Sequence, residues 1–91
     1  MTTTAKIAHR LIVVESIQTR LGTKASVALY LGDEEVFCDE VSLWKARSRE
    51  AFIKRCLEVL DIGDDALARE KIDKWLRTQN QDQTYDYYTF T

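Results

Sequence analysis

The chain has 91 residues, 45% of them hydrophobic and 31% charged, and its 13 basic and 15 acidic residues leave a net charge of −2. This length fits a single domain with one modest core, and the proportions are ordinary for a globular protein. Because the charge is close to zero, the chain lacks the overall basic field that draws proteins onto nucleic acid or anionic lipid. We therefore expect at most weak binding to nucleic acid.

A strand is the first expected element, over residues His9 to Ser16. The stretch from Ala5 to Ile17 is rich in β-branched residues, which favour strands, although several of its apolar residues are also spaced as on a helix. We predict that the connection after this strand runs from Gln18 to Lys24, with Gly22 near its centre.

The clearest local pattern predicts a β-hairpin. Alternate residues from Ala25 to Leu31 are apolar, which places them on one face of a strand. Val36 to Leu43 alternate in the same way, except that Asp39 interrupts the apolar face. The GDEE sequence between the two runs supplies a glycine and an aspartate, which suit a tight turn.

A helix is predicted after the hairpin, because five apolar residues share one helical face. They are Phe52, Ile53, Cys56, Leu57 and Leu60. Ser48 is the expected N-cap, with Ser42 as the alternative, and Gly63 is expected to end the helix in the left-handed conformation.

A second helix is predicted from Asp65 to about Thr78, with Asp64 or Asp65 as its N-cap. Its apolar face comprises Ala68, Ile72, Trp75 and Leu76. The charges on its outer face alternate in sign, which is typical of a solvated helix.

The C-terminal tail differs from the rest of the chain. Gln79 to Gln83 are polar and resemble a linker, whereas Thr84 to Thr91 combine aromatic residues and threonines, all strand formers. We therefore divide the chain into an α+β domain at residues 1–78 and a linker with an aromatic segment at residues 79–91.

Four aromatic residues in the tail are too many for a solvated terminus. They are Tyr85, Tyr87, Tyr88 and Phe90. The segment could complete the domain's own sheet as an edge strand, or it could add as a strand to a partner or to a second copy, with tyrosines as anchors. We favour the second arrangement and expect a protein partner or self-association.

No residues form a recognisable catalytic or metal-binding pattern. His9 is the only histidine, and spacing assigns to it neither a nucleophile nor an orienting acid. One histidine and two distant cysteines are a poor zinc ligand set, and the three glycines form no phosphate-binding loop. The carboxylates at Asp33, Glu34 and Glu35 crowd a turn, where solvation explains them. We predict a protein that is not an enzyme and has no cofactor, no metal and no small-molecule substrate.

The cellular location is predicted from three features. The opening MTTTAKIAHR has no apolar signal-peptide region, and the longest apolar run, Leu11 to Val14, is too short to span a membrane. Cys38 and Cys56 are too few for a disulfide framework, and we interpret both as core residues in a reducing compartment. A bridge between them would require a Cα separation below ~7 Å. We therefore expect a cytoplasmic protein without a membrane partner.

Basic residues gather between positions 45 and 55, at the predicted start of the first helix. They are Lys45, Arg47, Arg49, Lys54 and Arg55, against Glu50 alone. Positive charge at a helix N-terminus opposes the macrodipole by ~0.3–1 kcal/mol per charge. Pairing with the acids of residues 33–40 would explain the cluster within the domain. Alternatively, Lys45, Arg47 and Arg49 contact a phosphate or an acidic partner.

The run from Val36 to Cys56 resembles a short module of primase- and helicase-like proteins from phages and plasmids. In that module a hairpin strand with an aspartate is followed by leucine, an alanine–arginine step and a helix that opens arginine-x-x-phenylalanine. The matching residues are Asp39, Leu43, Ala46, Arg49 and Phe52. The resemblance implies a mobile-element context in DNA replication, with the module beside a catalytic domain.

Together these patterns predict an α+β fold: a small antiparallel sheet of about three strands with two helices packed on one face, and the C-terminal segment as a candidate extra strand. The expected core residues are Leu29, Leu31, Phe37, Val41, Phe52, Cys56, Leu57, Ile72, Trp75 and Leu76. The predicted function is a non-catalytic interaction module associated with nucleic-acid-processing machinery of a mobile element or phage. The alternative is a small free-standing protein-binding protein, such as a phage-type inhibitor or an assembly subunit. A third function is direct nucleic-acid binding through residues 45–55.

Overall fold

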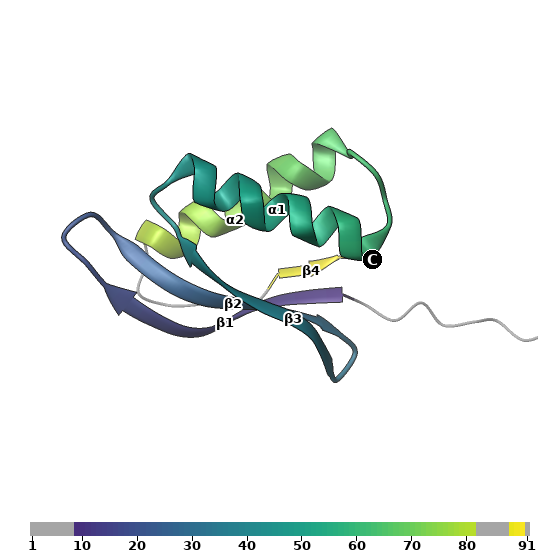
Figure 1. The fold of residues 1–91 in the computed structure, drawn as a ribbon, viewed down its shortest axis with the longest axis horizontal. Helices are drawn as coiled ribbons and strands as arrows, with labels where there is room; N and C mark the ends of the chain where they lie inside the picture. The colour runs from purple at the N-terminus through teal and green to yellow at the C-terminus, as the bar shows by residue number, and fades with distance from the viewer. Residues whose placement is uncertain (1–8, 82–87, 91) are drawn as a thin grey trace, which may run out of the picture.

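The computed structural model describes residues 9–81 and 88–90 (Figure 1). Three strands come first: β1 (His9–Gln18), β2 (Thr23–Leu31) and β3 (Glu34–Ser42). Each pairs antiparallel with the next, so the N-terminal half of the chain is a meander. This arrangement confirms the predicted strand and hairpin.

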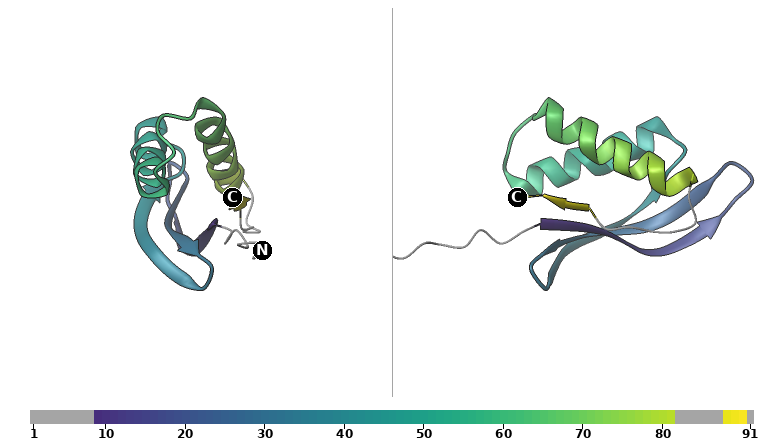
Figure 2. Two further views of the ribbon diagram at one scale, coloured as in Figure 1. Left: turned by 90° about the vertical axis from the view of Figure 1, so that its right-hand side faces the viewer. Right: turned by 180° about the vertical axis from the view of Figure 1, so that it is seen from behind.

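Two helices follow the meander, α1 (Ala46–Leu60) and α2 (Ala66–Gln81). Both lie on the same face of the sheet, as Figure 2 shows from the side and from behind. A short strand, β4 (Tyr88–Phe90), pairs antiparallel with the start of β1, which gives the sheet order β3-β2-β1-β4. A three-stranded antiparallel sheet under two helices is the predicted α+β fold. Among the described residues, no helix combines the length and the apolar character needed to cross a membrane.

The alternation of β1 is broken at one point. Its register against β2 shifts between Val13 and Glu15, which leaves Val14 outside the pairing and 57% exposed. A bulge of this kind exchanges the two faces of a strand. The exchange explains why the sequence of β1 alternates poorly and is also compatible with a helix.

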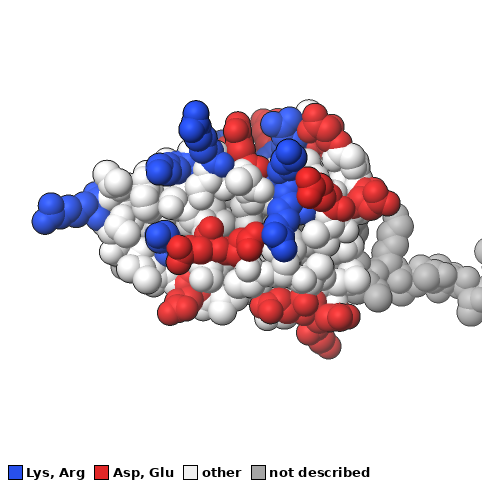
Figure 3. Space-filling model, in the orientation of Figure 1, with Lys and Arg blue, Asp and Glu red and all other residues white. Residues whose placement is uncertain are grey.

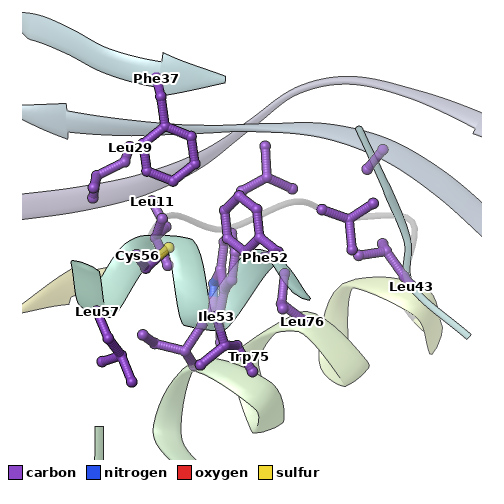
Figure 4. Close-up of a cluster of buried hydrophobic side chains, with 14 residues drawn as sticks. Leu11, Leu29, Phe37, Leu43, Phe52, Ile53, Cys56, Leu57, Trp75 and Leu76 are labelled. Carbon is purple, nitrogen blue, oxygen red and sulfur yellow. The ribbon is translucent and has the colours of Figure 1, made fainter. Parts of the chain in front are cut away.

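The core fills the space between the sheet and the two helices (Figure 4). Strands and helices contribute to it together, and the rings of Phe37 on β3 and Phe52 on α1 lie 5.7 Å apart at a tilted angle. Every residue of the predicted core is buried except Leu31. Leu31 is only half-buried because it ends β2 beside the turn at Gly32, where the hairpin curves away from the helices.

The cap of α1 differs from the prediction. Lys45 is the N-cap and makes no side-chain cap hydrogen bond. Ser48 lies in the first turn instead, where its hydroxyl accepts a hydrogen bond of 2.9 Å from the backbone N–H of Ser42. Both serine predictions were therefore wrong as caps, because the two serines bond to each other across the β3–α1 junction.

The connection between the helices is also closed by other residues than predicted. Asp61, with φ 55° and ψ 41°, is the left-handed residue that ends α1, so the prediction for Gly63 was wrong. Aspartate tolerates this conformation better than most residues. The prediction for Asp65 is confirmed, because its Oδ1 accepts hydrogen bonds from the backbone N–H groups of Leu67 and Ala68.

Helix α2 runs past its predicted end at Thr78 and includes Gln79 and Asn80. Gln79 is 1% exposed, because it lies four and three residues after Trp75 and Leu76, on the buried face of the helix. The polar linker predicted from Gln79 therefore does not begin there. Residues 82–87 of that prediction lie outside the described residues.

Candidate interaction surfaces

Three segments that are far apart in the sequence meet at one end of the molecule, on the left of Figure 1: the β1–β2 turn, the start of α1 and the end of α2. The Asn80 Oδ1 on α2 accepts a hydrogen bond of 2.8 Å from the backbone N–H of Thr23. A Cβ atom at Gly22 would lie 2.8 Å from that same oxygen and 3.0 Å from Cε3 of Trp44. The β1–β2 turn therefore packs closely against the end of α2 and against Trp44, which precedes α1.

Arg49 also connects separate elements at this end of the molecule. Its Nε donates a hydrogen bond of 2.7 Å to Oδ1 of Asp73 on α2, and its Nη1 donates one of 2.9 Å to the carbonyl oxygen of Leu43. The Arg49 side chain is only 12% exposed. The other oxygen of Asp73 accepts from Nε of Arg77 at 2.9 Å. Arg49 thus joins α1, α2 and the end of β3, and two of its nitrogens already have partners within the domain.

Lys45 and Arg47 have a different position, since both are exposed. Arg20 in the β1–β2 turn is also exposed, and Arg77 is 53% exposed. The turn, the start of α1 and the C-terminal part of α2 therefore present their cations at the same end of the molecule (Figure 3). We call this surface the basic end, and its members are Arg20, Lys45, Arg47 and Arg77. The sequence analysis missed Arg20 and Arg77, because no local pattern connects them to residues 45–49.

Part of the basic cluster does pair with the acids of residues 33–40. Nε of Arg55 lies 3.5 Å from Oδ2 of Asp39, and its guanidinium carbon lies 4.9 Å from the centre of the Phe37 ring. Nζ of Lys24 lies 3.2 Å from Oε1 of Glu40. Internal pairing therefore accounts for Arg55 and, through α2 rather than β3, for Arg49.

Acidic side chains gather at the opposite end of the molecule, over the β2–β3 hairpin and the α1–α2 connection (Figures 1 and 3). All are exposed: Asp33, Glu34, Glu35, Glu58, Asp61, Asp64 and Asp65. We call this surface the acidic end. Arg69 is paired there with Asp64 at 3.1 Å. Acidic side chains thus concentrate at this end, although Figure 3 shows further Asp and Glu side chains beside the cations on the left of the view.

Grooves flank α1 on two sides. One of about 660 Å³ lies between the end of α1 and the start of α2, with Leu57, Lys54 and Arg69 in its walls. Another, of about 510 Å³, lies between α1 and β3, with Ala51 and Phe52 in its walls. Both are open grooves rather than enclosed cavities, and their linings are of mixed charge. Among the described residues, no three His, Cys, Asp or Glu side chains form a group that could hold a metal ion.

The two cysteines are free and differ in environment. Cys56 is buried in the core, where burial, and then the charge of Asp39, raise its pKa to about 12 against a small opposing effect of a backbone hydrogen bond. Cys38 is exposed, so its prediction as a core residue was wrong; Phe37 and Val41 occupy the helix-facing side of β3, and Cys38 points to the other face. The pKa of Cys38 is raised by partial burial and by the charges of Glu35 and Asp39.

The aromatic tail is described only in part. Tyr85 and Tyr87 lie outside the described residues. The backbone of Tyr88 pairs with Leu11, and that of Phe90 pairs with His9. The role of these four residues in partner binding stays a prediction.

Comparison with protein-family models, curated proteins and solved structures finds no match for this chain. The resemblance of residues 36–56 to primase- and helicase-like proteins stays a prediction. The residues that carry it have roles in this fold: Leu43 and Phe52 are buried in the core, and Arg49 joins the two helices.

Proposed function

We propose that this chain is a non-catalytic interaction module whose basic end binds an acidic surface of a partner protein. The supporting observation is the concentration of unpaired cations at one end of the fold, since within the described residues neither Lys45 nor Arg47 forms an ion pair. The association with nucleic-acid-processing machinery of a mobile element rests on the sequence resemblance and is part of the same proposal.

The cations at the start of α1 have no evident value for folding. The first turn of α1 contains no acidic residue, and its N-cap makes no side-chain hydrogen bond. Lys45 and Arg47 therefore oppose the helix macrodipole by ~0.3–1 kcal/mol per charge. An incoming carboxylate would interact favourably with both cations and with the free N–H groups of the first turn. A binding role explains a charge pattern that stability does not.

A protein partner suits this surface better than nucleic acid. The basic end offers about three free cations, which predicts a log–log salt slope near −2.7 on duplex DNA at roughly −0.9 per phosphate contact. The acidic end would repel the remainder of an extended polyanion. A compact acidic patch on a protein can engage the basic end without approaching the acidic one.

The test is affinity capture from the native host with the full chain and with a variant carrying Lys45→Glu and Arg47→Glu. Reversal of two charges at the interface should abolish recovery of the partner. A matched control reverses Arg69 and Lys71, which are exposed in the N-terminal half of α2, away from Arg77. Equal recovery of the same partner with both variants would contradict the proposal. DNA binding that survives physiological salt and is lost with the first variant would replace the protein partner by nucleic acid.

A further inference from the structure

Strand β3 is the outer strand of the sheet, and among the described residues no strand lies beyond it. An edge strand presents a row of main-chain N–H and C=O groups that can pair with another extended chain. With nine residues, from Glu34 to Ser42, β3 is long enough for such pairing. This edge lies far from β4, on the opposite side of the sheet.

A groove accompanies this edge. The space of about 510 Å³ between β3 and α1 is walled by Asp39 and Glu40 from the strand and by Ala51, Phe52 and Arg55 from the helix. Ala51 is exposed, and Phe52 is 3% exposed. A strand added to β3 would direct every second side chain toward this groove. The rest of the helix wall is polar or charged and consists of Ser48, Lys54, Arg55 and Glu58. Small side chains therefore suit the position beside the exposed Ala51.

The other face of an added strand would meet carboxylates. Glu40 pairs with Ser26, Cys38 with Ala28 and Glu35 with Tyr30, so these β3 residues share the sheet face that lacks helices. Glu35 and Glu40 are exposed. Glu40 forms an ion pair with Lys24, but the two side chains are 57% and 42% exposed. Lys24 therefore neutralises the charge of Glu40 only weakly. Basic side chains in the added strand would be attracted to this face.

The same charges argue against pairing of β3 with a second copy of itself. Two antiparallel β3 strands would place Glu34, Glu35, Asp39 and Glu40 of each copy on one strand pair that contains no basic residue. Like charges across a strand pair are destabilising, and natural edge strands use them against self-association. The edge therefore rejects its own copy and selects a partner of opposite charge.

We propose that β3 and the groove beside α1 form a docking site for an extended partner segment in which apolar and basic residues alternate. The segment pairs its main chain with β3, places its small apolar side chains beside Ala51, and places its basic side chains beside Glu35 and Glu40. This surface is separate from the basic end, and it takes a partner of the opposite charge.

The experiment titrates the ¹⁵N-labelled full chain with an eight-residue peptide of alternating lysine and valine, capped at both ends. Amide shifts are expected at Phe37 to Val41 and along the groove side of α1. A peptide of the same composition with its lysines and valines in two blocks should bind at least about tenfold more weakly, because it cannot place one residue type on each face. Equal binding of both peptides, or shifts confined to other surfaces, would refute the proposal.

Two variants separate the edge from general electrostatic attraction. The double variant Glu35→Lys with Glu40→Lys should bind the alternating peptide about tenfold or more weakly than the native chain does. Ala51→Trp should also lower the affinity for the alternating peptide, because the larger side chain fills the groove without changing the charge. Glu70→Lys, at an exposed position of α2, is the control and should leave the affinity within about twofold. Unchanged affinity in the Ala51→Trp chain, with native amide spectra, would overturn the assignment of the groove.

Discussion

The two ends of the molecule are held together in different ways. At the basic end, hydrogen bonds join residues far apart in the sequence, such as Asn80 to Thr23 and Arg49 to Asp73. At the acidic end, Arg10 donates a long-range hydrogen bond of 2.8 Å to the carbonyl oxygen of Gly32 in the β2–β3 turn, but the bonds of Asp65 and of Arg69 with Asp64 in the α1–α2 connection span five residues or fewer. The basic end is therefore part of the tertiary structure, whereas the α1–α2 connection at the acidic end is locally capped. Substitutions at the basic end should destabilise the domain more than substitutions in this connection.

The largest effect is expected from Gly22→Ala. Gly22 has φ +147°, and a Cβ there would lie 2.8 Å from Oδ1 of Asn80. Strain and overpacking together should lower the free energy of unfolding by about 3 kcal/mol, measured by urea denaturation. The control is Gly63→Ala at the acidic end, where φ is +69° and no atom lies within 4 Å. That change should cost about 1 kcal/mol from backbone strain alone. Equal losses in the two variants would abolish the distinction between the ends.

The next effect is expected from Arg49→Ala. Its loss removes the partner of Oδ1 of Asp73 and of the carbonyl of Leu43, whereas Oδ2 of Asp73 keeps its bond to Arg77. The loss of these two partly buried hydrogen bonds should destabilise the domain by about 2 kcal/mol. Arg69→Ala removes an ion pair whose members are 47% and 80% exposed, and should change stability by less than about 0.5 kcal/mol. Thermal unfolding of both variants measures the contrast. A neutral Arg49→Ala would mean that Arg49 is free for a partner, as the sequence first suggested.

A smaller effect is expected from the local cap of the acidic end. Asp65→Ala removes the acceptor for the N–H groups of Leu67 and Ala68 and should cost about 1 kcal/mol. Hydrogen exchange should accelerate in the first turn of α2. At the Thr23 amide of the basic end, exchange should accelerate no more than the loss of global stability accounts for. Faster exchange at Thr23 beyond that loss of stability would show that the two ends are coupled.

The last measurement uses Cys56 as a reporter of global opening, in a chain with Cys38→Ser. Because the pKa of Cys56 is raised to about 12 in the fold, its thiol is protonated at pH 8 and should react with a disulfide reagent only when the domain opens. Its contribution to stability is intact below the unfolded pKa of ~8.5 and is lost as the pH rises toward the folded value. Arg49→Ala should accelerate labelling roughly 30-fold if it costs about 2 kcal/mol, whereas Arg69→Ala should leave the rate nearly unchanged. Similar acceleration by both would count against a separate acidic end.

The sequence predicted the structure well where a strand or helix has a regular apolar pattern and buries only one of its faces. Alternation in β2 and the five-residue stripe of α1 predicted their faces, because one side of each packs against the core. The prediction failed where the alternation of side chains along a strand is interrupted or was not applied. The bulge after Val13 obscured β1, and Cys38 was assigned to the core although the alternation with Phe37 places it outside.

The candidate sites were harder to predict than the fold. The cluster at residues 45–55 is visible in the sequence, but its members have different environments in the structure. Arg49 is largely buried and paired with Asp73, and Arg55 pairs with Asp39. Lys45 and Arg47 are exposed. Which arginine meets which carboxylate depends on how α2 packs on α1. No spacing along the chain encodes that choice.

The sequence by itself determined the fold class, the faces of the hairpin and the helices, and the N-cap of α2, because these depend on neighbours within a few residues. Only the tertiary structure decided the ends of α1 and α2, the role of Arg49 and the separation of charge into a basic and an acidic end. Those features arise when the β1–β2 turn, the start of α1 and the end of α2 are brought together by burial of a shared core. Hydrophobic burial is not directional, so it fixes which surfaces meet only once all the elements pack at the same time.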